Sequence, residues 1–95
     1  MVALDTIEGT INGSIWFHYS ISDDVLYLRL RSALNSEALG EETDEGLVLL
    51  RDSDSDAPIG LTIVNWWKRF GTGSLPDSLG AIEKKIEPWA GKLAA

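Results

Sequence analysis

The first third of the chain alternates hydrophobic and polar side chains with a period of two, which is typical of half-buried β-strands. Residues 6–11 and 14–21 flank Asn12-Gly13, a pair that tolerates the positive φ angles of a two-residue hairpin turn. A third strand is predicted over residues 25–31. The side chains expected to face the core are Ile15, Phe17, Tyr19, Ile21, Leu26, Leu28 and Leu30. Those expected on the opposite face are Trp16, His18, Ser20, Val25, Tyr27, Arg29 and Arg31.

Two further apolar runs follow a polar stretch. Residues 32–45 are rich in acidic side chains, whose mutual repulsion disfavours burial, so we predict a solvated loop or an irregular edge there. Residues 47–51 and 58–64 have strand length, and the Asp-rich connection 52–57 suits an antiparallel hairpin. The prediction is a four- to five-stranded antiparallel meander over about residues 5–64.

The apolar period then becomes that of helices, over about residues 65–90. Asn65 is placed to cap a short helical turn over residues 66–70, which Gly71 would end. Ser74 is placed to cap a second helix, and Pro88 would stop it. The apolar stripe of that helix is formed by Leu75, Leu79, Ile82 and Ile86. We therefore predict a single α+β domain, residues 1–95, in which this amphipathic helix packs on one face of the sheet.

Charge and composition limit the classes of molecule that this protein is expected to bind. Eight Lys and Arg residues against fifteen Asp and Glu give a net charge of −7, which repels nucleic acid and anionic lipid and favours a basic protein. Cysteine is absent, and no apolar run approaches the length of a membrane span, so we expect a cytoplasmic protein with no membrane partner. A chain of 95 residues buries only about 60–70% of its unfolded surface, so a homodimer would add stability.

Candidate chemistry is sparse. The alternating carboxylates of Asp52 to Asp56 begin as a calcium loop does, but Ala57 and Ile63 stand where such a loop needs Gly and Glu. We interpret the segment as a solvated hairpin, with weak calcium binding as the alternative. His18 is the single histidine, and its strand position indicates a sheet-surface residue. The sequence thus predicts no catalytic residue, no metal site and no cofactor.

The candidate interaction surface lies in the short helical turn and consists of Trp66, Trp67, Lys68, Arg69 and Phe70. Exposed aromatic rings beside cations are enriched at the centres of protein interfaces. The alternative is that the rings close the end of the sheet core.

Three segments carry a resemblance to a known family. Ser20 to Leu30 is an acidic turn entering a strand with a Leu-Tyr pair, residues 41–49 are an acidic lead into a strand, and Ile59-Gly60-Leu61-Thr62-Ile63 follows an acidic hairpin. Together, Ser20 to Val64 resembles the bacterial and archaeal domain of unknown function 2283. Thr62 departs from the usual acidic residue, and the hairpin tip lacks the common Asp-Gly. The resemblance implies an antiparallel sheet, no assigned activity, and a toxin-like protein as a partner class.

Two function hypotheses follow. The first is a small, acidic, non-enzymatic protein-binding module that self-associates, either antitoxin-like or a subunit of a larger assembly. The alternative is a small-ligand or metal-dependent enzyme whose site forms at a subunit interface from carboxylates and His18.

Overall fold

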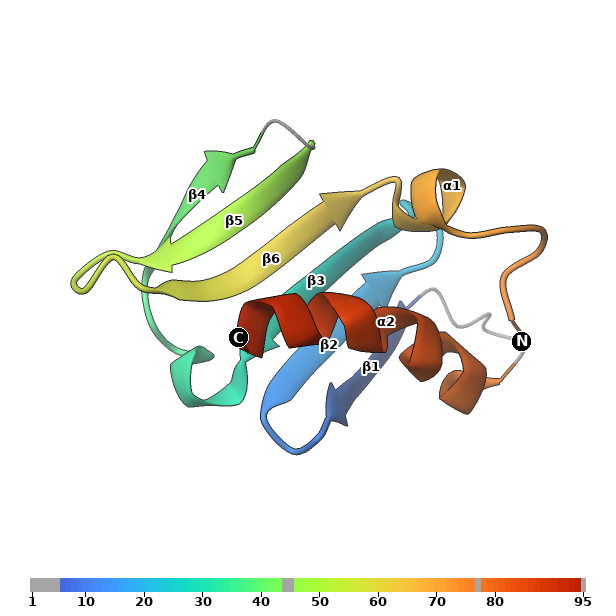
Figure 1. Cartoon of the computed structure of the whole chain (residues 1–95), viewed down its shortest axis with the longest axis horizontal. Helices are drawn as coiled ribbons and strands as arrows, with labels where there is room; N and C mark the ends of the chain where they lie inside the picture. Colours follow the sequence, from blue (N-terminus) through green and yellow to red (C-terminus); the bar gives the residue numbers. More distant parts are fainter. Residues whose placement is uncertain (1–5, 44–45, 77, 95) are drawn as a thin grey trace.

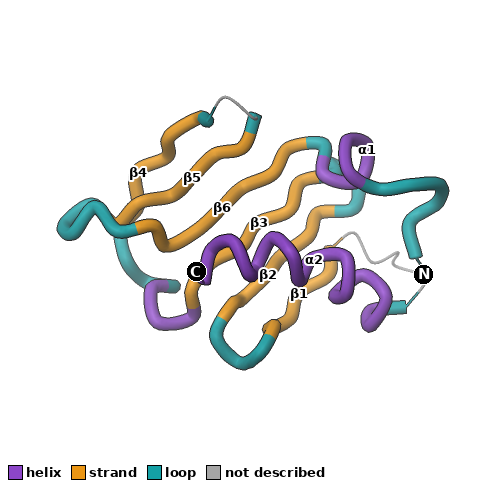
Figure 2. Tube along the Cα trace, viewed as in Figure 1, coloured by secondary structure: helices purple, strands orange, loops and turns teal. Residues whose placement is uncertain are grey.

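The computed structural model describes residues 6–43, 46–76 and 78–94, in which a six-stranded antiparallel sheet carries one long helix on one face (Figure 1; Figure 2). The elements are β1 (Thr6–Ile11), β2 (Ile15–Ser20), β3 (Val25–Leu30), η1 (Arg31–Ala33), β4 (Ala38–Glu42), β5 (Leu47–Asp52), β6 (Pro58–Val64), α1 (Trp66–Phe70) and α2 (Leu79–Ala94). The strand order is β1-β2-β3-β6-β5-β4. The α+β prediction is confirmed. The single meander of four to five strands is corrected to two three-stranded meanders, joined where β3 pairs with β6.

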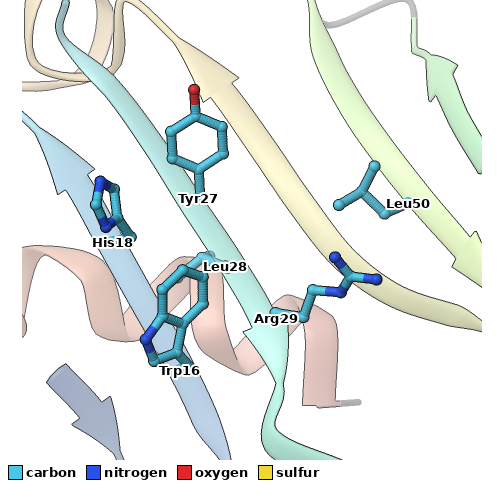
Figure 3. A pocket seen from close by; sticks show the side chains of 6 residues that line it. All are labelled: Trp16, His18, Tyr27, Leu28, Arg29 and Leu50. Atoms are coloured by element: carbon cyan, nitrogen blue, oxygen red, sulfur yellow. The ribbon is translucent and has the colours of Figure 1, made fainter. Parts of the chain in front are cut away.

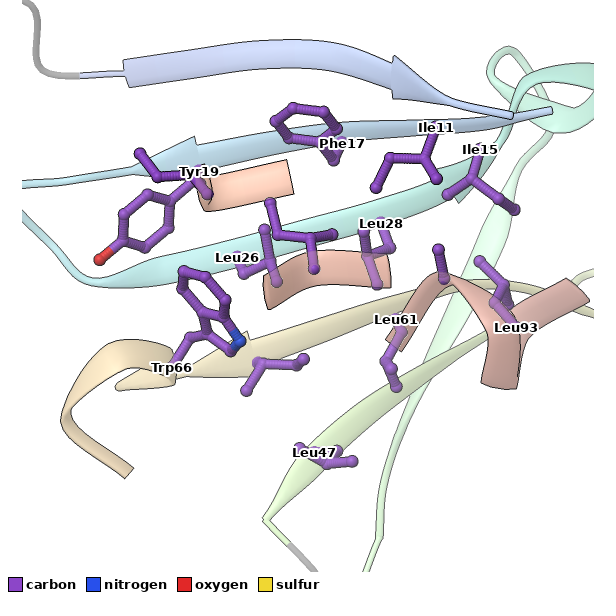
Figure 4. Packing of buried hydrophobic residues seen from close by; sticks show 14 residues of the cluster. Ile11, Ile15, Phe17, Tyr19, Leu26, Leu28, Leu47, Leu61, Trp66 and Leu93 are labelled. Carbon is purple, nitrogen blue, oxygen red and sulfur yellow. The ribbon is translucent and has the colours of Figure 1, made fainter. Parts of the chain in front are cut away.

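The period-two pattern of the first strands is confirmed. Asn12 and Gly13 adopt φ angles of 54° and 70°, as the predicted hairpin requires. Burial alternates along β2, where Ile15, Phe17 and Tyr19 are buried. Figure 4 shows these side chains packed with those of the neighbouring strands and of α2. The core cluster consists of Ile11, Ile15, Phe17, Tyr19, Leu26, Leu28, Leu47, Leu61, Ile63, Trp66, Ile82, Ile86, Ala90 and Leu93.

β4 is the strand that the sequence analysis missed. It pairs with β5 alone and is almost entirely exposed, so its acidic side chains cost no burial. Glu41 forms an ion pair with Arg51 of β5 at 3.1 Å. Charges on such an edge also discourage pairing with the edge of another sheet. The predicted irregular edge is therefore in the right place, but it is a regular strand.

The helix boundaries differ from the prediction. α2 begins at Leu79, after Ser78, whose hydroxyl accepts a hydrogen bond from the Ala81 amide at 3.2 Å, so Ser78 rather than Ser74 is the capping residue. Pro88 lies inside α2, which continues to Ala94. The turns beyond Pro88 carry apolar side chains of the core cluster. The free energy gained by burying them outweighs the loss of the one backbone hydrogen bond that proline cannot form. In the described residues, no helix is long and apolar enough to cross a membrane.

Candidate functional site

The predicted interaction segment forms α1, and a distant carboxylate fixes its start. Asn65 has a left-handed backbone (φ 57°) and forms no side-chain cap, contrary to the prediction. Asp24, in the β2–β3 turn, instead accepts hydrogen bonds from the amides of Trp67 at 2.9 Å and Lys68 at 3.0 Å. The hydroxyl of Tyr19 donates to the same carboxylate at 2.6 Å. Asp24 therefore satisfies the free amides of α1 from a position 43 residues away along the chain.

This network shifts two pKa values. Burial acts to raise the pKa of the Asp24 carboxyl, but the hydrogen bonds from Tyr19, Trp67 and Lys68, together with the Lys68 charge, lower it below its ordinary value. Burial, the hydrogen bond to Asp24 and its negative charge all raise the pKa of the Tyr19 hydroxyl. At neutral pH the carboxylate is therefore the acceptor and the phenol is the donor.

The two adjacent tryptophans have different environments. Trp66 is 1% exposed and packs edge-on against Tyr19, with ring centroids 5.0 Å apart. Trp67 is half-buried, and its indole Nε1 donates to the Gly73 carbonyl at 2.8 Å. Trp66 thus closes the end of the core, as the alternative interpretation has it, and cannot contact a partner in this fold.

The rest of the predicted segment stays at the surface and meets a residue that the sequence analysis did not single out. Phe70 is 45% exposed, and its ring lies 4.7 Å from that of Trp89 in α2. The Arg69 guanidinium lies over the Phe70 ring at 4.8 Å, and the Lys92 ammonium lies over the Trp89 ring at 4.7 Å. We call these four side chains the aromatic–cation ladder. Lys68 is exposed beside them on α1.

A second surface is the sheet face opposite α2, which we call the open face. The strand register arranges its side chains in two rows that run across the sheet. The first row is Thr10, Trp16, Arg29, Gly60, Leu50 and Gly40. The second row is Glu8, His18, Tyr27, Thr62, Val48 and Glu42. No described element of the chain packs over the middle of these rows (Figure 1).

A pocket of about 330 Å³ lies on the open face, lined by Trp16, His18, Tyr27, Leu28, Arg29 and Leu50 (Figure 3). Gly60 lies between Arg29 and Leu50 in the first row, and the Leu50 side chain packs over it. A Cβ atom at Gly60 would lie 2.8 Å from Leu50 Cδ1 and 2.9 Å from the Leu28 carbonyl oxygen. Glycine is therefore required at this position for the packing of Leu50.

The rings of Trp16, His18 and Tyr27 form one side of this pocket, which we call the aromatic wall. The ring centroids of Trp16 and His18 are 5.8 Å apart, as are those of His18 and Tyr27. Glu8 lies 2.7 Å from His18 Nδ1 and orients the imidazole. Since these residues extend from β-strands, the backbone holds the aromatic wall in place.

Arg29 supplies the cation of the pocket. Its guanidinium donates a hydrogen bond to the Ser36 carbonyl, which holds the side chain along the sheet. Its Nε is buried and has no hydrogen-bond partner among the described residues. Arg29 is thus positioned by the fold but keeps unused donor capacity.

The Asp-rich hairpin between β5 and β6 uses one of its carboxylates for its own turn. Asp52 Oδ1 accepts the amides of Asp54 at 2.8 Å and Ser55 at 3.2 Å. Asp56 has a positive φ of 64°. Among the described residues, no three His, Cys, Asp or Glu side chains gather into a group that could hold a metal ion.

Comparisons with known proteins add no identification, since no family model, no curated protein and no solved structure matches this chain. The resemblance to domain of unknown function 2283 stays a prediction.

Proposed function

We propose that this protein is a non-enzymatic binding module whose open face contacts a basic protein, in an antitoxin-like role or as a subunit of a larger assembly. The observation that carries the proposal is the pocket on the open face, which Trp16, Tyr27 and Arg29 line from neighbouring strands. Trp, Tyr and Arg are the residue types that dominate binding energy at protein interfaces.

The shape of the surface supports an apolar anchor. Tyr27 is 40% exposed, and Trp16 and Leu50 are half-buried, so each still has apolar area to lose to a partner. Burial of about 100 Å² of such area contributes about 2.5 kcal/mol before the costs of association. A partner side chain placed between the aromatic rings and Leu50 would bury the exposed apolar area of Trp16, Tyr27 and Leu50 together.

The charge around the pocket selects the partner. Residues 1–65 contain 3 Arg and no Lys against 12 Asp and Glu, so their net charge is 3 − 12 = −9. Glu8 and Glu42 stand at the two ends of the second row, and both are exposed. A mostly apolar centre that contains Arg29, with an acidic rim around it, complements a partner that carries a hydrophobic side chain flanked by Lys or Arg.

The experiment compares two substitutions of one kind on the two faces of the sheet. The tagged protein is first used to recover its partner from the host, and the interaction is rebuilt with the purified partner. Tyr27→Lys places a cation in the centre of the open face. Leu39→Lys is the matched control, because Leu39 is 63% exposed on β4 and its side chain lies on the other face. Circular dichroism checks that both variants fold.

We expect Tyr27→Lys to raise the Kd for a basic partner at least tenfold and Leu39→Lys to change it less than threefold. Equal effects of the two substitutions would place the contact elsewhere. Recovery of homogeneous protein with no partner, under native and crosslinking conditions alike, would contradict the proposal.

The oriented imidazole favours a second candidate, a small-ligand or metal-dependent enzyme completed by another subunit. His18 faces the pocket and is held by Glu8 at 2.7 Å, as a general base often is by a carboxylate. Calcium, zinc and manganese are titrated while the melting temperature is followed. A rise that His18→Asn abolishes would favour this candidate, because a ligand that binds only the folded state must stabilise it.

A further inference from the structure

Positive and negative charges are segregated along this chain. All four Lys residues and Arg69 follow residue 65, where only three acidic residues occur, so residues 66–95 have a net charge of 5 − 3 = +2. The preceding residues have a net charge of 3 − 12 = −9. The total of −7 therefore hides a basic helical part and an acidic sheet part, and a single net charge is a poor guide to what each surface binds.

Although α2 packs on the sheet, the acidic β5–β6 hairpin and α1 lie apart in space (Figure 1). The molecule is elongated, with extents of 42 × 28 × 26 Å. The β5–β6 hairpin projects at one end of the long axis, while α1 lies toward the other end (Figure 1). The hairpin contains exposed Asp54, and Glu37 lies beside it, since the Ser53 amide donates to the Glu37 carbonyl at 3.0 Å. One chain cannot bring its own hairpin to its own aromatic–cation ladder.

We propose that the aromatic–cation ladder binds the acidic β5–β6 hairpin of a second copy of this chain. The Lys92 ammonium is already held over the Trp89 ring, so little side-chain freedom is lost when a carboxylate meets it. The Arg69 guanidinium, which also donates to the Gly46 carbonyl at 3.2 Å, holds its positive charge over the neighbouring Phe70 ring. The exposed ring of Phe70 adds apolar area between the two cations. Asp54 and Glu37 of the second copy supply the opposite charges.

Such a contact joins two different surfaces, so it is head-to-tail. Each added copy leaves one ladder and one hairpin unoccupied, and the assembly grows with concentration rather than stopping at a two-fold dimer. The open face is not used, so this self-association is independent of the proposed partner binding.

The test mixes two variants that each lack one of the two surfaces. Phe70→Ser with Lys92→Glu removes one ring and one cation of the ladder, and Glu37→Lys with Asp54→Lys replaces two carboxylates at the hairpin by cations. Sedimentation velocity measures the mass of each variant alone and of an equimolar mixture. We expect wild-type protein to grow with concentration, each variant to stay monomeric, and the mixture to form a two-chain complex that does not grow further.

A matched pair of single variants keeps the test valid if the double variants are poorly folded. Lys92→Glu and Lys84→Glu change the charge equally, and both residues are exposed on α2, but Lys84 is not part of the ladder. We expect Lys92→Glu to reduce self-association at least fivefold and Lys84→Glu to leave it within twofold. Equal loss in both, a mixture that stays monomeric, or a wild-type dimer that does not grow would each overturn the proposal.

Discussion

Removal of the Asp24 side chain is expected to destabilise the protein by a large and specific amount. Asp24→Gly is the informative substitution, because Asp24 has a positive φ of 54° that glycine adopts without strain. Loss of an N-cap costs about 0.5–2 kcal/mol. The Tyr19 residue is 2% exposed, and leaving its hydroxyl unpaired costs about 1–3 kcal/mol. We therefore expect the free energy of unfolding to fall by about 2–4 kcal/mol, a large share of the usual 5–15 kcal/mol.

The measurement is urea unfolding followed by tryptophan fluorescence, which is sensitive here because Trp66 and Trp67 adjoin the network. Asp23→Gly is the control, since it adds the same glycine entropy to the unfolded chain but removes only a 3.3 Å hydrogen bond from the Ser20 hydroxyl. If Asp24→Gly were no more destabilising than Asp23→Gly, α1 would not be held by this carboxylate and the reasoning would be refuted.

The same network has a predictable pH dependence. The pKa of Asp24 is lower in the folded protein than in the unfolded chain, so its ionisation stabilises the fold. That stability is fully present above the unfolded pKa of about 3.9 and is lost as pH falls through the folded pKa. Asp24→Asn should lack this contribution, so its difference from wild type in urea midpoint should shrink below about pH 4. A difference that stays constant from pH 6 to pH 2.5 would contradict the assignment.

Two further predictions concern the sheet and the helix. Gly60→Ala brings a Cβ to 2.8 Å from Leu50 and should lower the free energy of unfolding by about 1–3 kcal/mol, whereas Gly40→Ala, whose nearest contact is 3.2 Å, should cost less in the same urea titration. Pro88→Ala should raise it by about 2 kcal/mol, because alanine can donate to the Lys84 carbonyl, although it also loosens the unfolded chain. A destabilised Pro88→Ala variant would show that proline shapes the packing of α2.

Hydrophobic alternation and turn residues predicted the first strands and their hairpin correctly, because both features depend on residues that are close in sequence. The alternation in β2 and β3 assigned both sheet faces, and Asn12-Gly13 located the first hairpin, because side-chain direction and turn geometry depend on neighbouring residues. β4 was not predicted as a strand because an exposed edge strand needs no apolar face and therefore shows no hydrophobic alternation. α2 continues past Pro88 because the burial of Ala90 and Leu93 outweighs the local effect of proline, and such burial depends on the sheet rather than on neighbouring residues.

The candidate sites depended more on contacts between distant residues. Asp24 and α1 are separated by more than forty positions, so local spacing cannot reveal this cap and points to Asn65 instead. Trp89 became part of the aromatic–cation ladder only through its contact with Phe70. The alternation placed Trp16 on the open face, but nothing in the sequence states whether a second layer covers that face.

The most direct test of partner binding through the open face uses the absence of cysteine from the chain. Two single-cysteine variants, Tyr27→Cys on the open face and Lys84→Cys on the solvent side of α2, are labelled with a maleimide with and without the purified partner. We predict that the partner slows labelling of Tyr27→Cys at least tenfold and leaves Lys84→Cys unchanged. Unchanged labelling of Tyr27→Cys by a saturating partner would contradict the account.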